Sequence, residues 1–425
     1  MELNTVLFTV FLAVGLINLF HFGLYIVGAN FYDIGQFWRQ RRLPKRMFRT
    51  APLVTVLIPA HNEELGIIRT LESVRRNTHQ KLQIIVIDDF STDATSDLVM
   101  KYICEHPNRS ISLLKTPKNV GKAGALNYAL GRHAIGEYIM TLDADSVLGR
   151  KSIARALTYF RDPKVVGVAA NVRVMDSPSI LGLLQKFEHM VGYRSKKFYS
   201  LANCEFIIGG VASTYRRDIL KQVGFYDTDT TTEDIGLSLK IAALGNRDHR
   251  LVYGADVVAM TEGVQTFKSL LRQRYRWKMG MLQNLLKNIR LFANNDPIYT
   301  RSLTMYRIPM AFLGELLLIM EPFLLMYVIY LSIMLQSTAL FVGAYMTITA
   351  YILWNLWPDE HHTVWQKTYL SLYAPILYFV FYIMSFVQIV SIFRCLVNGK
   401  QITRRTKTAS HWISPERSGQ AVQLT

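Results

Sequence analysis

Long apolar stretches occupy both ends of the chain and leave a more polar region between them. The first, at 5–27, contains 23 residues without a formal charge, enough for a helix that crosses about 30 Å of hydrocarbon. Three further apolar stretches come late in the sequence, at 308–335, 339–357 and 369–393. We therefore expect membrane helices at both ends and a soluble domain between residues 39 and 305.

The central region alternates short β-branched runs with stretches of helical period. The strand-like runs are VTVLI from Val54, QIIVI from Gln83, ISLL from Ile111 and YIMTL from Tyr138, and amphipathic stretches of roughly twelve residues separate them. Strands that alternate with helices predict an α/β fold with a doubly wound sheet. Such a sheet is expected to be mainly parallel and buried on both faces.

Basic residues gather beside the apolar stretches. The net charge is +17, and the lysines and arginines concentrate at 39–49, at 268–290 and in the tail GKQITRRTK from Gly399. Anionic lipid headgroups account for this placement, so no nucleic-acid partner is expected. The positive-inside rule places the soluble domain in the cytoplasm. The chain start lacks the pattern of a cleaved signal peptide, which favours a retained anchor at 5–27.

The basic tail conflicts with a simple count of membrane crossings. Three crossings after residue 305 would leave the C-terminus outside, whereas its basic residues favour the cytoplasm. The stretch 308–335 exceeds one crossing and contains Glu315, Glu321 and Pro322. We therefore expect a broken, partly interfacial segment there, with the tail packed near the soluble domain. The two glutamates should face a polar path or another helix, or lie near an interface.

Cysteines and nucleotide-binding signatures exclude several classes of site. Cys104, Cys204 and Cys395 are far apart, so neither a disulfide framework nor a zinc site is indicated. The sequence has no GxxxxGK[ST] loop and no strand-linked GxGxxG. Neither a P-loop nucleotidase nor a dinucleotide enzyme is therefore indicated.

Polar and acidic residues follow three of the predicted strands. Pro59, Ala60 and Glu63 follow VTVLI, Asp88 and Asp89 follow QIIVI, and Asp143 and Asp145 follow YIMTL. In doubly wound sheets, ligands bind in the crevice at the carboxyl ends of the strands. Asp143 and Asp145 are one residue apart and can reach one hard cation, which suits Mg²⁺ or Mn²⁺. For each motif taken alone, an ordinary surface turn is the alternative.

Two helix starts also carry charged residues. Lys122 in NVGKAGALN lies where backbone N–H groups and an ammonium can meet an anion, although a routine helix start with a solvated lysine has the same pattern. In TTEDIGLSLKI, Glu233 and Asp234 begin a helix that Thr231 or Thr232 can cap. The helix dipole alone favours acids at this place.

The stretch RQRYRWKMGMLQNLLKNIRLF (272–292) has apolar residues every three or four positions. This period predicts an amphipathic helix, and its basic residues beside a membrane span suggest that the helix lies in the bilayer interface. Gln273 and Trp277 are four residues apart and share a face, with Arg276 beside them. Taken alone, Trp277 is more typical of an interfacial anchor.

Together these motifs resemble a known family. LIPAHNEE (57–64), DDFSTD (88–93), DAD (143–145), TED (232–234) and QRYRW (273–277) resemble the motif series of processive family 2 glycosyltransferases. These membrane enzymes make cellulose, chitin, hyaluronan and poly-N-acetylglucosamine. The stretches GKAGALN, GGVASTYRRDIL, QRYRW and HWISPERSG are most similar to poly-β-1,6-N-acetyl-D-glucosamine synthases. Phe90 departs from the family, which usually has glycine at this position.

The resemblance implies a GT-A-like fold and donor-side roles for the strand-end residues. Asp88 or Asp89 would bind the uracil and ribose of a UDP-sugar, with Pro59, Ala60 and Glu63 nearby, while Asp93 would cap the following helix. Asp143 and Asp145 would hold a Mg²⁺ or Mn²⁺ ion at the diphosphate. Lys122 and Arg276 would stabilise the UDP leaving group, whose charge grows as the glycosidic bond breaks.

The resemblance also implies acceptor-side roles. Asp234, beside Glu233, would deprotonate the acceptor hydroxyl as general base, and the product would invert from α to β. Trp277 and Gln273 would bind the acceptor sugar. The implied partners are a UDP-sugar donor, a growing polysaccharide acceptor, the lipid bilayer and a small membrane accessory subunit. The resemblance implies UDP-N-acetylglucosamine as the donor.

Other functions remain open at this stage. A hyaluronan, chitin or cellulose type of synthase would carry the same motifs. A non-processive transferase that glycosylates a lipid carrier would share DDFSTD and DAD but generally lacks the QxxRW pattern. A transporter or scaffold with a non-catalytic sugar-nucleotide fold would bind UDP without transfer.

Combined with the apolar stretches, the resemblance divides the chain into six parts. They are an N-terminal membrane helix (1–30), a basic juxtamembrane linker (31–50), a cytoplasmic GT-A-like domain (51–265), an amphipathic interfacial helix (266–295), a C-terminal membrane region (306–397) and a basic cytoplasmic tail (398–425). The protein is therefore expected in the plasma membrane as a multi-pass protein.

Overall fold

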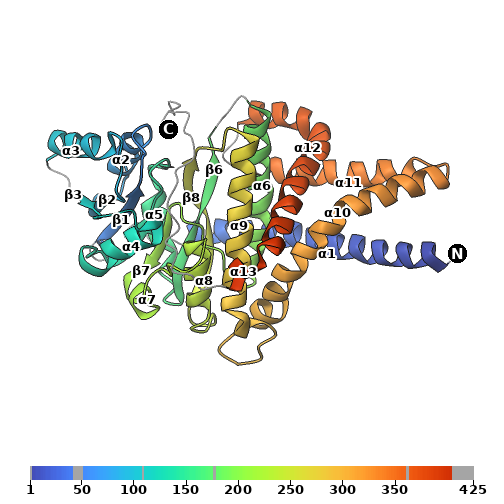
Figure 1. Ribbon diagram of the computed structural model, residues 1–425, viewed down its shortest axis with the longest axis horizontal. Coiled ribbons are helices and arrows are strands. Elements are labelled where there is room, and N and C mark those ends of the chain that lie inside the picture. Colours follow the sequence, from blue (N-terminus) through green and yellow to red (C-terminus); the bar gives the residue numbers. More distant parts are fainter. Residues whose placement is uncertain (1, 42–50, 108–109, 176–178, 360–362, 404–425) are drawn as a thin grey trace.

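The computed structural model describes residues 2–41, 51–107, 110–175, 179–359 and 363–403. The basic residues 42–50 and the tail beyond 403 lie outside these ranges, as does the HWISPERSG stretch. The centre of the described chain is an eight-stranded sheet with the strand order β3-β2-β1-β4-β7-β6-β8-β5 (Figure 1).

The first half of the sheet is parallel, as expected from the alternating pattern. Its strands are β1 (Val54–Ala60), β2 (Leu82–Asp88), β3 (Ile111–Lys115) and β4 (Tyr138–Thr141). Each of them coincides with an expected strand, and all three neighbouring pairs are parallel. Their carboxyl ends therefore lie along one edge of the sheet.

The second half of the sheet is mixed. It contains β5 (Val147–Leu148), β6 (Val165–Val174), β7 (Ser213–Arg216) and β8 (Arg250–Thr261). Strand β7 is antiparallel to both β4 and β6, whereas β6 and β8 are parallel and β5 is antiparallel to β8. Parallel pairs predominate, which confirms the predicted α/β class with a mainly parallel sheet.

Helices cover both faces of the sheet. One face packs against α2 (Ile67–Arg75), α3 (Thr95–Glu105) and α5 (Ser152–Tyr159). The other packs against α4 (Gly121–Arg132), α7 (Arg217–Gln222) and α8 (Glu233–Ala242). Val56 and Ile58 belong to the first core and Leu57 to the second, because successive strand side chains point to opposite faces. Burial of each such side chain stabilises the fold by about 1.5–3 kcal/mol.

A layer of three long helices lies beside the sheet. It contains α6 (Ile180–Leu201), α9 (Phe267–Lys287) and α12 (Val364–Val397), which run next to one another (Figure 1). Leu184, Leu270, Met384 and Val387 form one apolar cluster across these helices. The short α13 (Gly399–Thr403) follows α12 and contacts α9.

Three further helices extend away from the sheet on the side of this layer (Figure 1). They are α1 (Glu2–Arg41), α10 (Ile308–Met334) and α11 (Ala339–Leu356), and the short η1 (Ile289–Leu291) and η2 (Ser302–Arg307) connect α9 to α10. Among the described residues, three helical segments are long and apolar enough to cross a membrane: Asn4–Arg39, Ser302–Met334 and Ala339–Leu356.

The expectation of a broken segment at 308–335 is wrong. Helix α10 is continuous through Pro322, which removes only one of its many backbone hydrogen bonds. The two glutamates do face other helices, as one of the expected placements required. Glu315 accepts from Lys278 of α9 at 2.7 Å, and Glu321 accepts from the Ser385 hydroxyl of α12 at 2.7 Å.

Helix α1 does not end at the expected boundary near residue 30. It continues to Arg41 because its last turns dock on the soluble domain. Asp33 pairs with Lys197 of α6 at 2.5 Å, and the Arg39 guanidinium lies 3.5 Å from the centre of the Tyr159 ring. The expected linker is therefore helical in its first part.

Candidate active site

The loop after β2 surrounds its acidic residues with hydrogen-bond donors. Asp88 is 3% exposed and accepts hydrogen bonds from the Ser91 N–H at 2.9 Å and from the Ser96 hydroxyl. Asp93 accepts from the N–H of Thr95, the first residue of α3, at 3.0 Å. Each of these carboxylates therefore has hydrogen-bond donors of its own, which lets several acids lie in one turn. Asp93 holds the start of α3, as expected.

Asp89 performs a related task for α4. It is fully buried and accepts from the Thr116 hydroxyl at 2.8 Å and from the N–H groups of Val120 and Gly121 at 2.9 and 2.8 Å. The backbone donors that open α4 therefore already have an acceptor inside the protein. The N–H groups of Val120 and Gly121 in the NVGKAGALN motif therefore do not form an anion site.

Phe90 occupies a backbone conformation that explains the usual glycine of the family. Its φ is +64°, in the left-handed region, and its side chain is exposed. A side chain in this region costs roughly 1–2 kcal/mol, whereas glycine adopts it freely. The backbone at Phe90 thus has a conformation that glycine adopts readily. The Phe90 side chain is exposed next to Asp89.

The residues that follow β1 join the same strand-end region. Pro59 and Ala60 are the last two residues of β1, and the Ala60 carbonyl accepts the Asp89 N–H at 2.8 Å. The Glu63 side chain is buried, and its N–H donates to the Thr95 hydroxyl at 2.9 Å. The structure thus brings together the loops that carry the predicted donor-binding residues.

Lys122 lies at the centre of the charged groups of the site. Its Nζ is 2.6 Å from Asp143 Oδ1 and 3.3 Å from Glu233 Oε1. Gly210 makes room for it, since a Cβ there would lie 2.7 Å from the Nζ. Burial alone would lower the pKa of Lys122, but Asp143, Glu233 and Asp234 raise it. The lysine is therefore neither solvated nor free, and it connects two predicted motifs.

Asp234 lies at the start of α8 and has a raised pKa. It lies in the first turn of α8, and its Oδ1 accepts the Ile235 N–H at 2.8 Å. Burial and the neighbouring Glu233 raise its pKa to about 6, against the opposing charges of Lys122 and Arg276. A carboxyl group with this pKa accepts a proton near neutral pH more readily than an ordinary aspartate.

Thr232 caps α8 by position but not with its hydroxyl. It is the N-cap residue, yet its side chain makes no capping hydrogen bond. The hydroxyl instead accepts from Asn284 Nδ2 of α9 at 3.1 Å. A tertiary contact has therefore replaced the local capping bond that the sequence pattern predicts.

Asp143 and Asp145 offer oxygen ligands for a small hard cation. The Asp143 side chain is 30% exposed, and Asp145 accepts from the Ser146 hydroxyl at 2.9 Å. No group of three or more acidic, His or Cys side chains suited to a metal occurs in the described ranges. Mg²⁺ and Mn²⁺ often take only one or two carboxylates and complete their coordination with water and phosphate oxygens. The two aspartates fit a cation site that the substrate completes.

Comparisons with known proteins agree with this arrangement. Residues 55–224 match the family model described as Glycosyl transferase family 2. The chain therefore carries a family 2 glycosyltransferase domain. The matched segment contains Asp88, Asp89, Lys122, Asp143 and Asp145, whereas Glu233, Asp234 and α9 lie after it.

Two relatives and one solved structure extend the comparison. Poly-beta-1,6-N-acetyl-D-glucosamine synthase of Staphylococcus aureus strain COL is 32% identical over 238 residues, which cover 55% of this chain and 56% of the relative. The synthase of the same name from Staphylococcus epidermidis is 31% identical over 256 residues, or 60% and 59% of the two chains. The match thus spans less than two thirds of these relatives.

The mannosyltransferase PcManGT of Pyrobaculum calidifontis, solved with GDP-Man and Mn²⁺, has a similar fold. Its TM-score is 0.55 at 22% sequence identity, covering 89% of this chain and 99% of that one. At this identity the likeness concerns the fold alone. It agrees with the α/β architecture expected for the glycosyltransferase domain.

Helix α9 presents the remaining predicted residues beside the glycosyltransferase domain. Trp277 is partly buried, and the guanidinium of Arg274 lies 4.2 Å from the centre of its ring. Arg276 is exposed and close enough to Asp234 to lower its pKa. The side-chain oxygen of Gln273 is buried without a hydrogen-bond partner in the described part of the chain. An acceptor hydroxyl can supply the missing donor.

The residues that hold Trp277 in place were not among those predicted from the sequence. Arg274 is 4% exposed and forms an ion pair with Glu188 of α6 at 2.5 Å. The spacing of three residues between Arg274 and Trp277 is a usable local signal, because such residues are neighbours on a helix. Glu188, by contrast, comes from a distant helix and left no local signal.

Proposed function

We propose that this chain is a membrane-embedded inverting glycosyltransferase that polymerises a UDP-sugar into a β-linked polysaccharide and secretes it. The similarity to poly-beta-1,6-N-acetyl-D-glucosamine synthases favours UDP-N-acetylglucosamine as donor. The single observation that carries the proposal is Lys122, which joins Asp143 on the donor side to Glu233 in the turn that holds the base Asp234.

The donor binds at the carboxyl ends of β1, β2 and β4 in this proposal. Pro59, Ala60, Glu63 and either Asp88 or Asp89 line the nucleoside side, with the buried aspartates also holding the shape of the loops. Asp143 and Asp145 hold Mg²⁺ or Mn²⁺, which neutralises the charge of the diphosphate when bound.

The transfer step uses the protein's own acid–base group. Asp234 takes the proton of the acceptor hydroxyl, whose oxygen attacks C1 of the donor sugar from the face opposite UDP. The C1–O bond to UDP breaks, and UDP leaves with the bonding electron pair. Lys122 and Arg276 stabilise the negative charge that develops on it. Attack from the opposite face converts an α-linked donor into a β-linked product.

Acceptor binding and export involve the helices beside the domain. Trp277 stacks on the acceptor sugar, Gln273 binds one of its hydroxyl groups, and Arg274 keeps the indole in place. Helices α1, α10 and α11 anchor the protein in the lipid bilayer and border the exit path, together with a small accessory subunit. The catalytic domain lies on the cytoplasmic side, where UDP-sugars are available.

The test is incubation of membranes that contain the protein with separate radiolabelled UDP-sugars. We expect UDP-N-acetylglucosamine to give a high-molecular-weight product that a β-1,6-N-acetylglucosaminidase degrades, and Asp234→Asn membranes to give none. Label confined to a lipid extract would instead indicate a transferase that acts on a lipid carrier. UDP binding without any transfer would favour a non-catalytic transporter or scaffold.

A further inference from the structure

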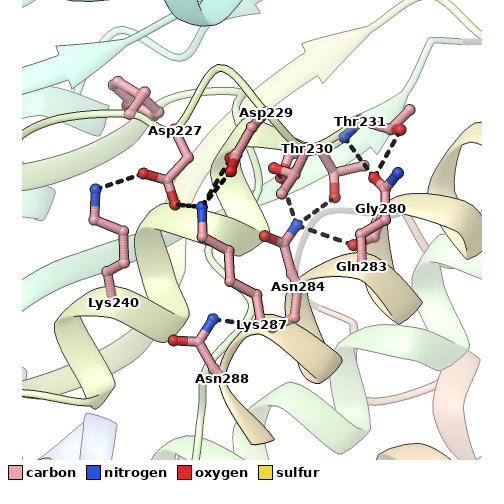
Figure 2. A network of polar contacts seen from close by, with 12 residues as sticks. Asp227, Asp229, Thr230, Thr231, Lys240, Gly280, Gln283, Asn284, Lys287 and Asn288 are labelled. Carbon is pink, nitrogen blue, oxygen red and sulfur yellow. Dashed lines mark hydrogen bonds and ion pairs between the residues drawn. The ribbon is translucent and has the colours of Figure 1, made fainter. Parts of the chain in front are cut away.

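The loop before Glu233 is tied to the second half of α9 by ion pairs. Lys287 Nζ lies 2.7 Å from Asp227 Oδ2 and 2.7 and 3.0 Å from the two carboxylate oxygens of Asp229 (Figure 2). Lys240 of α8 holds the other oxygen of Asp227 at 2.9 Å. Burial would lower the pKa of Lys287, but its hydrogen bonds to Asp227 and Asp229 raise it, so the lysine stays charged.

Two side chains about one turn closer to Trp277 continue this attachment. Gln283 Oε1 accepts the N–H and the hydroxyl of Thr231 at 2.8 and 2.9 Å. Asn284 Nδ2 donates to the Thr232 carbonyl at 2.9 Å and to its hydroxyl at 3.1 Å. Thr232 directly precedes Glu233 and Asp234. Hydrogen bonds from α9 therefore fix both residues that precede Glu233 and Asp234.

Two glycines bring α8 and α9 into direct contact. A Cβ on Gly280 of α9 would lie 2.2 Å from the Thr232 hydroxyl oxygen, and a Cβ on Gly236 of α8 would lie 2.8 Å from Asn284 Oδ1. At these points the Thr232 and Asn284 side chains pack directly against the glycine of the other helix. Any residue larger than glycine at position 280 would push the N-terminus of α8 away from α9.

The same helix carries the acceptor-side residues. Trp277 and Gly280 are three residues apart, or about 4.5 Å along the helix axis, and Lys287 lies ten residues beyond Trp277, or about 15 Å. A helix of this length is stiff, so its two ends move together. The position of Asp234 relative to Trp277 is therefore set through α9 and not through the loop alone.

We propose that Lys287, Asn284 and Gln283 are positioning residues that hold the base Asp234 at reacting distance from an acceptor sugar bound at Trp277. This inference rests on the proposed function and adds the residues that set its geometry. A base displaced by about 1 Å loses roughly 100-fold in rate. Because these residues contact neither nucleotide loop, they affect transfer and leave UDP binding unchanged.

The experiment compares two variants of this contact with two matched controls. Lys287→Met removes the ion pairs, and Gly280→Ala displaces Thr232 without any change of charge. Lys164→Met breaks an exposed ion pair with Asp248, and Gly131→Ala adds a methyl group on a helix where no atom lies within 4 Å. The measurements are kcat and KM for UDP-N-acetylglucosamine with an oligosaccharide acceptor, UDP affinity by calorimetry, and the thermal unfolding midpoint.

We expect Lys287→Met and Gly280→Ala to lower kcat by about 10- to 100-fold at unchanged UDP affinity. Lys287→Arg, which keeps the charge, should recover most of the activity, and both controls should stay within roughly twofold of the parent protein. If Gly280→Ala fails to fold, the comparison of Lys287→Met with Lys164→Met decides the test.

Two results would overturn the inference. One is a kcat of Lys287→Met equal to that of Lys164→Met, and the other is a fall in UDP affinity that parallels the fall in kcat. Either result in an active parent protein removes the positioning role and leaves the proposed function standing. A parent protein that binds UDP but transfers no sugar removes both.

Discussion

The Arg173 guanidinium of β6 lies 2.9 Å from the carboxylate of Asp359, which follows α11. This ion pair fixes the end of α11 beside the sheet, whereas α10 extends away from it. The two helices therefore form a hairpin whose tip is the short connection near Ser337. Since α12 then packs along α6 and α9, the tail begins on the same side as the catalytic domain.

Cysteine labelling in intact cells tests this topology. Ser337→Cys should react with an impermeant maleimide, whereas Ser418→Cys in the tail should react only after permeabilisation. Both are placed in a background in which alanine replaces the three native cysteines, two of which are buried. Labelling of the tail in intact cells would require a further crossing by α12, and the positive-inside interpretation of the tail would be wrong.

The Asp234→Asn variant separates donor binding from transfer. We expect transfer to fall by about 10²- to 10⁴-fold, because the amide cannot take the acceptor proton. UDP affinity should remain close to that of the parent protein, since the proposed role of Asp234 is toward the acceptor and not the nucleotide. Calorimetry with UDP and Mg²⁺ measures this. A collapse of UDP affinity together with activity would reassign Asp234 to the donor site.

The pKa of Asp234 predicts the acidic limb of the pH profile. The base works in its ionised form, so kcat should fall about tenfold per pH unit below a midpoint near pH 6, the value to which burial and Glu233 raise the pKa of Asp234. Lys122 lowers that pKa through its charge. Lys122→Met should therefore shift the midpoint to higher pH as well as slow the reaction. An unchanged midpoint would mean that another group controls the profile.

Metal removal tests the role of Asp143 and Asp145. Activity should disappear in EDTA and return with Mg²⁺ or Mn²⁺, because hard oxygen ligands and a diphosphate favour a hard cation. Added metal should not rescue Asp145→Ala. Full activity of the parent protein in excess chelator would show that the two aspartates act without a cation.

The Glu188→Leu variant tests how Trp277 is held. It leaves the Arg274 guanidinium buried without its carboxylate. This should lower the free energy of unfolding by about 3–5 kcal/mol and the Tm by about 5–10 °C. The acceptor KM should rise, since Trp277 loses a fixed neighbour. Asp248→Leu, which removes the carboxylate of an exposed pair, is the control and should change neither quantity. Equal effects of the two variants would show that the Arg274–Glu188 ion pair does not hold Trp277 in place.

Sequence reasoning located most of the candidate site, because the site lies at strand ends. The β-branched runs that become β1, β2 and β4 are recognisable locally, and the chemistry follows directly after each of them. What it could not locate were partners from distant segments. Lys122 appeared equally suited to a phosphate or to solvent until the fold placed it between Asp143 and Glu233.

The sequence by itself determined the elements, their periodicity and the order of the motifs, since these depend on residues that are neighbours along the chain. Tertiary structure decided which apolar segments extend away from the sheet and which pack along the helices beside it. The stretch 369–393 is as apolar as a membrane span, yet α12 packs on Leu184 and Leu270 of two earlier helices. It also decided that Thr232 bonds to Asn284 and not to its own helix, because a contact between distant segments depends on packing that no local pattern records.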